Sequence, residues 1–201
     1  MTSTRPVILA SASKSRANLL RAAGVNVEII PAHTDEDSVK ASLKAEGATA
    51  AQCAEMLAEL KAVQVSQRHD NALVIGADQM LDCEGQWFDK PADMAGARQH
   101  LMTLRGKAHV LPTAVAVALN GARIWHHVAM PRLTVRPFSD TFIDSYLAVA
   151  GTAVLSSVGA YQLEGPGAQL FSRIDGDFFT ILGLPLLELL AFLREHEAVP
   201  R

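Results

Sequence analysis

Short apolar runs alternate with segments of helical periodicity along the first part of the chain. Four consecutive apolar residues, 7–10, predict a short buried strand. Three serines at alternate positions follow, and residues at helical spacing come next: Arg16, Leu19, Leu20 and Ala23. We expect the hydroxyl of Ser13 to cap this helix and Gly24 to end it.

A strand that passes through serines into a helix start is suited to hold an anion. The amides of the first helical turn, the positive end of the helix dipole and the cation Arg16 would all be available to it. Phosphate is the most natural ligand for such a turn. An ordinary capped turn between a strand and a helix has the same pattern, so this stretch alone leaves both interpretations open.

The following segments repeat the alternation of strand and helix. Residues 25–30 predict a second strand, because apolar and polar residues alternate over the first four of them, and the acidic run 34–37 predicts a loop. A long helix is expected over residues 49–68, with Lys61 near the edge of its apolar side. The apolar run 72–75 predicts a central strand buried on both faces, and Asp78 lies just past this run.

A hairpin signal marks the middle of the chain, because Asn120-Gly121 separates two strand-like segments, 110–119 and 122–130. Further helices are expected after Asp93, over residues 139–149 and after Pro185. The pattern predicts an α/β fold with a mixed central sheet flanked by helices. We interpret residues 1–201 as one domain, long enough to form two lobes around a cleft.

The composition of the chain argues against several classes of protein. The 201 residues are 49% hydrophobic and 19% charged, which supports a large core and argues against disorder. The net charge of −3 argues against a nucleic-acid partner. Cys53 and Cys83 lack metal-ligand spacing, and the longest apolar stretch, 178–193, is interrupted and too short to cross a bilayer. We therefore expect a cytoplasmic protein with reduced cysteines and no membrane partner.

Three carboxylates occupy positions suited to chemistry. Asp78 lies at the end of a predicted buried strand, where an acid is costly unless it is paired or bound to a cation. Glu36 lies in the predicted loop after another strand, and Glu164 lies in a glycine-rich segment able to wrap a ligand. Carboxylate oxygens suit Mg²⁺ or Mn²⁺ better than zinc. Each acid alone is also compatible with a simple role in a turn or a helix cap.

Lys61 and Lys90 are the cations available to pair with these acids or with phosphate. Taken singly, Lys61 fits a side chain that extends its amine to solvent, and Lys90 fits a surface turn before Pro91. The chain has no Gly-Lys-Ser/Thr phosphate loop, no complete dinucleotide glycine fingerprint and no Gly-x-Ser-x-Gly elbow. These absences argue against P-loop, Rossmann-cofactor and serine-hydrolase chemistry.

In combination, these pieces resemble the Maf-like family of nucleotide pyrophosphatases. The resemblance runs from residue 9 to about residue 193, nearly the whole chain. Six motifs carry it in order: Leu9-Ala10-Ser11-Ala12-Ser13 with Arg16 and Leu19-Leu20, Asp35-Glu36, Leu57-Ala58-Glu59-Leu60-Lys61-Ala62, Gly76-Ala77-Asp78, Lys90-Pro91 and Gly183-Leu184-Pro185. Each motif is weak alone, but six in order over this length are specific.

The resemblance implies a fold similar to the inosine triphosphate pyrophosphatases, with a cleft for a nucleoside triphosphate. It implies hydrolysis between the α and β phosphates, and a role in removing non-standard or modified nucleotides. Asp78 corresponds to the family's proton acceptor. The positions around the phosphates are Ser11, Ser13, Arg16, Glu36, Lys61 and Lys90. Asp78 and Glu36 are the expected ligands of a divalent metal, Mg²⁺ or Mn²⁺, and a homodimer is a family expectation.

Three positions bear on the substrate. Gln79 and Glu164 resemble the branch of the family that acts on 7-methyl-GTP rather than the dTTP/UTP branch. A carboxylate facing the base could accept from the N1–H and N2–H groups of guanine and attract the cationic methylated ring. Ser15 departs from that branch, which usually carries an aromatic residue there. Two other functions stay open: a non-catalytic nucleotide-binding regulator of cell division, and an unrelated metal phosphatase that releases inorganic phosphate.

Overall fold

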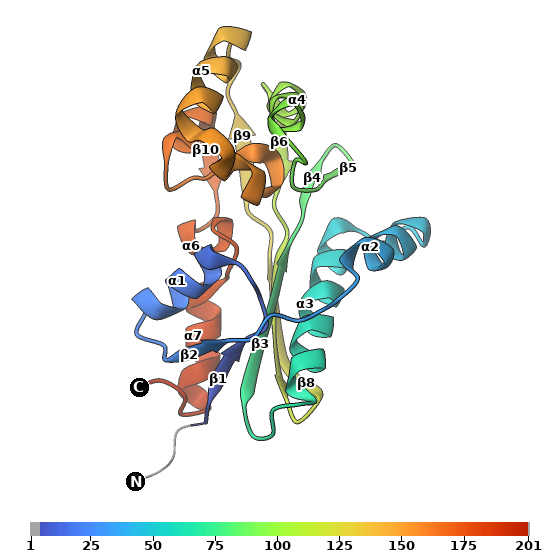
Figure 1. Ribbon diagram of the computed structural model, residues 1–201, viewed down its shortest axis with the longest axis vertical. Helices are drawn as coiled ribbons and strands as arrows, with labels where there is room; N and C mark the ends of the chain where they lie inside the picture. Colours follow the sequence, from blue (N-terminus) through green and yellow to red (C-terminus); the bar gives the residue numbers. More distant parts are fainter. Residues whose placement is uncertain (1–4, 201) are drawn as a thin grey trace. The chain divides into compact units, whose positions relative to one another are not determined.

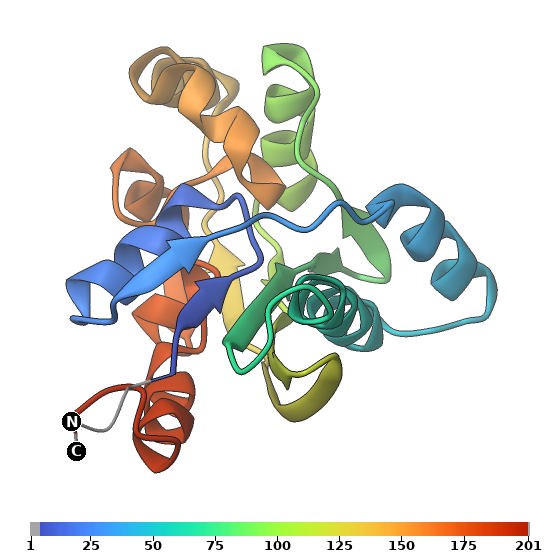
Figure 2. The ribbon, with the colours of Figure 1, turned by 60° about the horizontal axis from the view of Figure 1, so that its bottom comes forward.

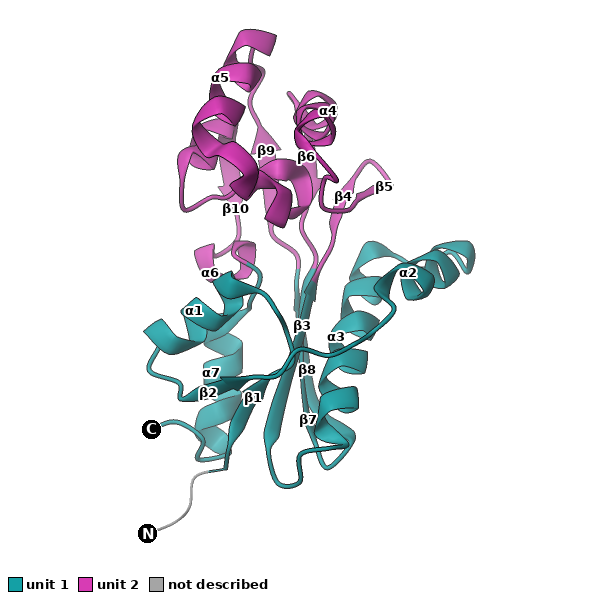
Figure 3. Cartoon of the chain, viewed as in Figure 1, with its two compact units in different colours: residues 1–78, 113–129, 183–201 teal, residues 79–112, 130–182 magenta. Residues whose placement is uncertain are grey.

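The computed structural model describes residues 5–200, which form an α/β fold divided into two compact units (Figure 3). Unit 1 is made of residues 5–78, 113–129 and 183–200. Unit 2 is made of Gln79–Pro112 and Met130–Leu182. The expected α/β class is confirmed, but the strands form two five-stranded sheets, one in each unit, rather than one central sheet.

The sheet of unit 1 is mixed and has the order β2-β1-β3-β7-β8. Strand β1 pairs in parallel with both β2 and β3, whereas β7 and β8 pair antiparallel. The bounds of its strands are β1 Val7–Leu9, β2 Val27–Ile29, β3 Leu73–Gln79, β7 Thr113–Leu119 and β8 Ala122–Ala129. The parallel pairs give the order of a βαβ arrangement, with β1 between the two strands that follow it in the chain.

Helices cover both faces of this sheet (Figures 1 and 2). Trp125 of β8 stacks on Phe192 of α7 with ring centroids 5.0 Å apart, whereas Arg123 of β8 pairs with Glu55 of α3. Helix α1 lies on the side of α7, and α3 lies on the other side. The helices of unit 1 are α1 Lys14–Ala22, α2 Glu36–Ala45, α3 Ala50–Ser66 and α7 Leu186–Glu195.

The sheet of unit 2 is antiparallel and has the order β10-β9-β6-β4-β5. Its strands are β4 Leu81–Cys83, β5 Gln86–Phe88, β6 Ala108–Val110, β9 Arg132–Val135 and β10 Phe171–Asp175. Its helices are α4 Met94–Leu104, α5 Asp140–Ala150 and α6 Phe178–Ile181, with the 3-10 turns η1 Gly151–Ser156, η2 Val158–Ala160 and η3 Pro166–Leu170. Its core packs side chains of this sheet, such as Leu81 and Leu133, against those of α4 and α5, such as Leu101 and Ile143.

Local signals in the sequence locate several elements well. Ser13, Asp93 and Ser139 cap α1, α4 and α5, and each side chain accepts a hydrogen bond from a first-turn amide. Asn120 and Gly121 both have positive φ and join β7 to β8, as the hairpin signal predicts. Within residues 5–200, no helix is both long and apolar enough to cross a membrane.

Three expectations need correction. Glu36 is not in a loop but is the first residue of α2, because Asp35 caps that helix and acidic residues favour its first turn. The predicted strand 110–119 is divided at Pro112 between β6 and β7, in different sheets. The buried run predicted over residues 72–75 is too short, because β3 continues to Gln79; Asp78 lies at the end of this strand, as expected.

Candidate active site

Asp78 lies near the carboxyl end of β3, on the face that α3 covers. Gly76 shares that face, because residues two apart in a strand point the same way. A Cβ atom at Gly76 would collide with the carbonyl oxygen of Ala58 and lie 2.6 Å from the amide nitrogen of Ala62, both in α3. Only a glycine therefore allows the helix to approach the strand this closely, and this approach brings Lys61 to Asp78.

Lys61 is buried and its ammonium group binds two carboxylates. Its Nζ lies 2.6 Å from Oδ1 of Asp78 and 2.7 Å from Oε1 of Glu36. The side chains of Lys61 and Asp78 are each 9% exposed, whereas that of Glu36 is 41% exposed. The buried pair satisfies two charges that would be costly alone. The interpretation of Lys61 as a side chain that reaches solvent is therefore wrong.

Ser11 and Arg16 form a second buried group in unit 1. Ser11 follows β1, and its hydroxyl oxygen accepts from Nη1 of Arg16 at 3.0 Å and from the amide of Ser13 at 3.3 Å. Ser13 in turn accepts from the amide of Arg16 at 3.4 Å. These bonds fix the turn between β1 and α1, so the serines define its shape as well as its polarity.

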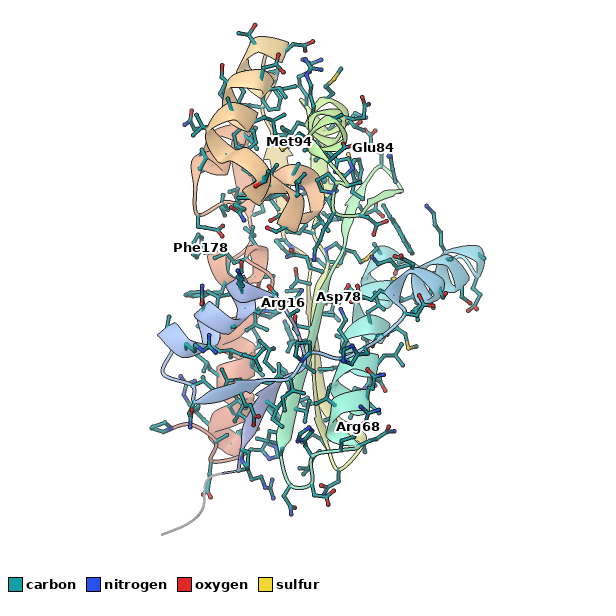
Figure 4. All side chains as sticks on the ribbon, viewed as in Figure 1. Arg16, Arg68, Asp78, Glu84, Met94 and Phe178 are labelled. Carbon is teal, nitrogen blue, oxygen red and sulfur yellow. The ribbon has the colours of Figure 1, made fainter. Side chains whose placement is uncertain are left out.

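Arg16 is tied to two distant parts of unit 1. Its Nη1 donates to the carbonyl oxygen of Ala77 at 2.9 Å, and its Nε donates to that of Gly183 at 2.8 Å. Burial lowers the pKa of Arg16 from its ordinary value, and the charges of Asp78 and Glu36 oppose this effect. The guanidinium therefore lies in the field of both carboxylates, and Figure 4 shows Arg16 and Asp78 close together.

Sequence reasoning missed how Gly183 takes part in this group. It has φ +107, and a Cβ there would lie 3.3 Å from Nε of Arg16. The motif Gly183-Leu184-Pro185 was available as a signal, but only the fold brings it to Arg16. The sequence does indicate that Gly76 allows a close backbone approach, and the fold shows that α3 is the element that makes it.

The structure thus places six of the predicted residues in unit 1: five lie together, and the sixth, Ser13, lies at the start of α1. The five are Ser11, Arg16, Glu36, Lys61 and Asp78. Ser15 is half-buried in the first turn of α1.

Three predicted residues belong to unit 2. Lys90 is exposed after β5, and Glu164 is exposed in the turn between η2 and η3. The Nε2 atom of Gln79 donates to the carbonyl oxygens of Thr180 at 3.1 Å and Ile181 at 3.2 Å, which fixes the orientation of this amide. Gln79 therefore supports the end of α6 in addition to any role toward a ligand.

The donors present suit a metal that is shared with a ligand. Asp78 and Glu36 bring carboxylate oxygens to one point, the ammonium group of Lys61. Among residues 5–200, no group of three or more His, Cys, Asp or Glu side chains could hold a metal. Two carboxylates completed by phosphate oxygens and water are a usual environment for Mg²⁺.

Buried cations, two carboxylates and a serine turn at a helix start are chemically suited to a phosphate-bearing ligand in an α/β protein. The family described as Maf-like protein matches residues 6–196. The chain therefore belongs to the Maf-like family.

Known proteins resemble the chain over nearly its whole length. A nucleoside triphosphate pyrophosphatase of Paramagnetospirillum magneticum is 58% identical over 96% of this chain and 100% of its own. A protein of the same name from Granulibacter bethesdensis is 55% identical over 96% and 98%. A 7-methyl-GTP pyrophosphatase of Mesorhizobium japonicum is 47% identical over 98% of each chain.

Among solved structures, a nucleoside-triphosphatase / dITP/XTP pyrophosphatase of Mycobacterium abscessus matches with a TM-score of 0.43 and 15% identity. The match covers 97% of this chain and 98% of that one.

Proposed function

We propose that the protein is a nucleoside triphosphate pyrophosphatase. It hydrolyses the bond between the α and β phosphates and releases a nucleoside monophosphate and pyrophosphate. Family membership and relatives of that name at 55% and 58% identity support this function. The observation that carries it is the buried Lys61, bound to Asp78 and Glu36 in the field of Arg16.

Charge explains why this arrangement suits the reaction. A triphosphate is strongly anionic, and cleavage adds charge to the departing pyrophosphate. Fixed cations that meet this charge lower the barrier, because they need no reorganisation when it develops. Lys61 and Arg16 supply such cations in unit 1, together with the amides at the start of α1. In this proposal Lys90 contributes a further cation.

The carboxylates have the complementary task. Asp78 accepts the proton of the attacking water, and Lys61 holds its carboxylate in one orientation through the 2.6 Å ion pair. Ser11, Ser13 and Arg16 shape the turn that receives the phosphates. Asp78 and Glu36 would hold a divalent cation such as Mg²⁺ or Mn²⁺, which supplies charge neutralisation for the phosphates when bound.

The proposal also names a candidate substrate. We propose 7-methyl-GTP as a candidate whose base is recognised by Gln79 and Glu164. Ser15 is a third position that influences specificity. The relative from Mesorhizobium japonicum, named for that substrate, supports the candidate. The relatives of higher identity bear the broader name, so a panel of nucleotides is needed.

The test incubates the purified protein with Mg²⁺ or Mn²⁺ and 7-methyl-GTP, dTTP, UTP or ITP, and resolves the products. We expect a monophosphate and pyrophosphate, with one preferred nucleotide. Asp78→Asn should retain the fold and lose about 10²–10⁴-fold in rate. Asp70→Asn is the matched control, because Asp70 is an exposed aspartate in the turn before β3.

Three other outcomes would contradict parts of this proposal. Release of a diphosphate and inorganic phosphate would indicate a phosphatase. Nucleotide binding without product over hours would support a non-catalytic regulator of cell division. Wild-type rates in Asp78→Asn would show that the proton acceptor lies elsewhere.

A further inference from the structure

Gln64 of α3 uses both ends of its amide to hold the backbone of a single residue. Its Oε1 accepts from the amide of His33 at 2.9 Å, and its Nε2 donates to the carbonyl oxygen of His33 at 3.1 Å. A pair of bonds of this kind copies the pairing of two strands, and it fixes both the position and the orientation of the peptide. The side chain of His33 is not needed for either bond.

The peptide that Gln64 holds lies in the segment that leads to Glu36. Strand β2 ends at Ile29, and the next amide, that of Ile30, still bonds to Leu9 of β1. Helix α2 begins at Glu36. The bonds to Gln64 lie between these two points, where the chain crosses α3 (Figure 1).

Glu36 needs such support more than its partners do. Its side chain is 41% exposed, whereas those of Lys61 and Asp78 are each 9% exposed. An ion pair with one exposed partner contributes little to the position of that partner, because solvent screens the attraction and the side chain loses freedom. The backbone that presents Glu36 therefore contributes to the position of its carboxylate beside Lys61.

Lys61 and Gln64 are three residues apart in α3 and so lie on the same face of the helix. One face of α3 thus supplies the cation that binds Glu36 and the amide that holds the chain just before Glu36. The segment is further packed through Ala32, which contacts a buried cluster that includes Val65. This apolar contact packs the segment against the core of unit 1, and the two amide bonds set its register along the helix.

We propose that Gln64 is a positioning residue for Glu36. Among the described residues, its side-chain hydrogen bonds go to His33 and to the hydroxyl group of Thr34, not to Lys61 or Asp78. It acts by holding the peptide of His33 so that Glu36 meets the ammonium group of Lys61. The catalytic part of this proposal rests on the proposed pyrophosphatase function, and the anchoring part rests on geometry alone.

The test compares Gln64→Met, Glu36→Gln and the double variant. Methionine keeps the length of the side chain and removes the two hydrogen bonds to His33 and the weaker one from the hydroxyl group of Thr34. Displacement of Glu36 should lower kcat/KM for the preferred nucleotide about tenfold in Gln64→Met. In the Glu36→Gln background, the same substitution should change kcat/KM less than about twofold, because the carboxylate that it displaces is already absent. Gln67→Met is the matched control, an exposed glutamine at the end of the same helix.

A second readout does not need activity. Amide hydrogen exchange of a peptide that covers residues 31–36 should be faster in Gln64→Met than in the wild type, because the amide of His33 loses its acceptor. Exchange in Gln67→Met should match the wild type. Unchanged exchange of this peptide in Gln64→Met would overturn the anchoring.

The two proposals fail in different ways. A wild-type protein that releases no pyrophosphate would overturn the function, while the exchange experiment still decides the anchoring. An active wild type with unchanged kcat/KM in Gln64→Met would overturn the positioning role. An equal loss in the wild-type and Glu36→Gln backgrounds would also overturn it, because Gln64 would then act independently of Glu36.

Discussion

The buried histidine of unit 2 predicts how stability depends on pH. His109 of β6 is 1% exposed, and its Nε2 lies 2.8 Å from the hydroxyl oxygen of Tyr161. Its Nδ1 is buried and has no hydrogen-bond partner among residues 5–200. Burial, with a smaller effect of Arg132, lowers the pKa of His109 from 6.5 to about 4. The folded protein therefore holds this imidazole neutral.

The sign and size of the change in stability follow from the difference between the unfolded and the folded pKa of His109. Between the folded and the unfolded pKa, the unfolded chain binds a proton that the folded chain does not, so acid favours unfolding. Stability is complete above the unfolded pKa of 6.5, declines as the pH falls, and reaches its full loss below the folded pKa of about 4. Integration gives a loss of about 2 kcal/mol between about pH 7.5 and about pH 5.

The perturbation is His109→Gln, which removes the titrating group and keeps a polar side chain opposite Tyr161. Urea unfolding followed by far-UV circular dichroism gives the free energy of unfolding at each pH. The wild type should lose about 2 kcal/mol more than the variant over this range. Other acids and bases titrate in both proteins and cancel in the comparison.

Tyr161→Phe separates the titration from the hydrogen bond. It removes the hydroxyl group but leaves the imidazole buried, so it should lower stability and keep the pH dependence of the wild type. Burial raises the pKa of Tyr161 far above its ordinary value, so the hydroxyl itself does not titrate in this range. If His109→Gln and the wild type lose stability in parallel as the pH falls, His109 is not held neutral by burial and the reasoning is refuted.

Three further variants test the geometry of unit 1. Lys61→Met should lower the free energy of unfolding by about 3 kcal/mol, because it leaves the buried carboxylate of Asp78 without its cation; urea unfolding measures this. Gly76→Ala should cost about 1–3 kcal/mol and lower the rate of pyrophosphate release, because its methyl group would push α3 away from β3. Gly183→Ala should raise KM for the nucleotide, because its φ of +107 is strained for alanine and its Cβ would press on Arg16.

Each variant has a control. Asp78→Asn in the Lys61→Met background should restore part of the lost stability, and no recovery would show that the loss is not electrostatic. Gly96→Ala, in α4, is the control for both glycine variants, since its Cβ would meet only ordinary contacts of 3.4 Å or more. If Gly76→Ala is as stable and active as Gly96→Ala, α3 does not depend on the missing side chain.

Much of the local structure was predictable because its signals lie within a few residues of each other. A capping hydroxyl or carboxylate acts on an amide three residues away, as Ser13 and Asp93 do. Asn120-Gly121 specifies its turn by its own backbone preferences.

The elements that sequence reasoning missed lack an apolar pattern, although Asp35 does cap α2. Helix α2 has no buried residue, so no apolar stripe marks it, and its acidic start resembles a loop. Strand β10 is at the edge of its sheet and largely exposed, so it shows no alternation of buried and exposed positions. Neither element therefore has an apolar periodicity that marks it in the sequence.

The sequence by itself determined the α/β class, the main caps, the hairpin and the residue types of a phosphate site. Only the tertiary structure decided which of these residues meet. Lys61 and Asp78 are 17 positions apart, and Arg16 and Gly183 are 167 apart. Such contacts depend on the order of strands in the sheet and on the closeness of helix to strand, which no local preference encodes. No motif marks Gln64. The same packing brings its amide to the backbone of His33, in the segment that leads to Glu36.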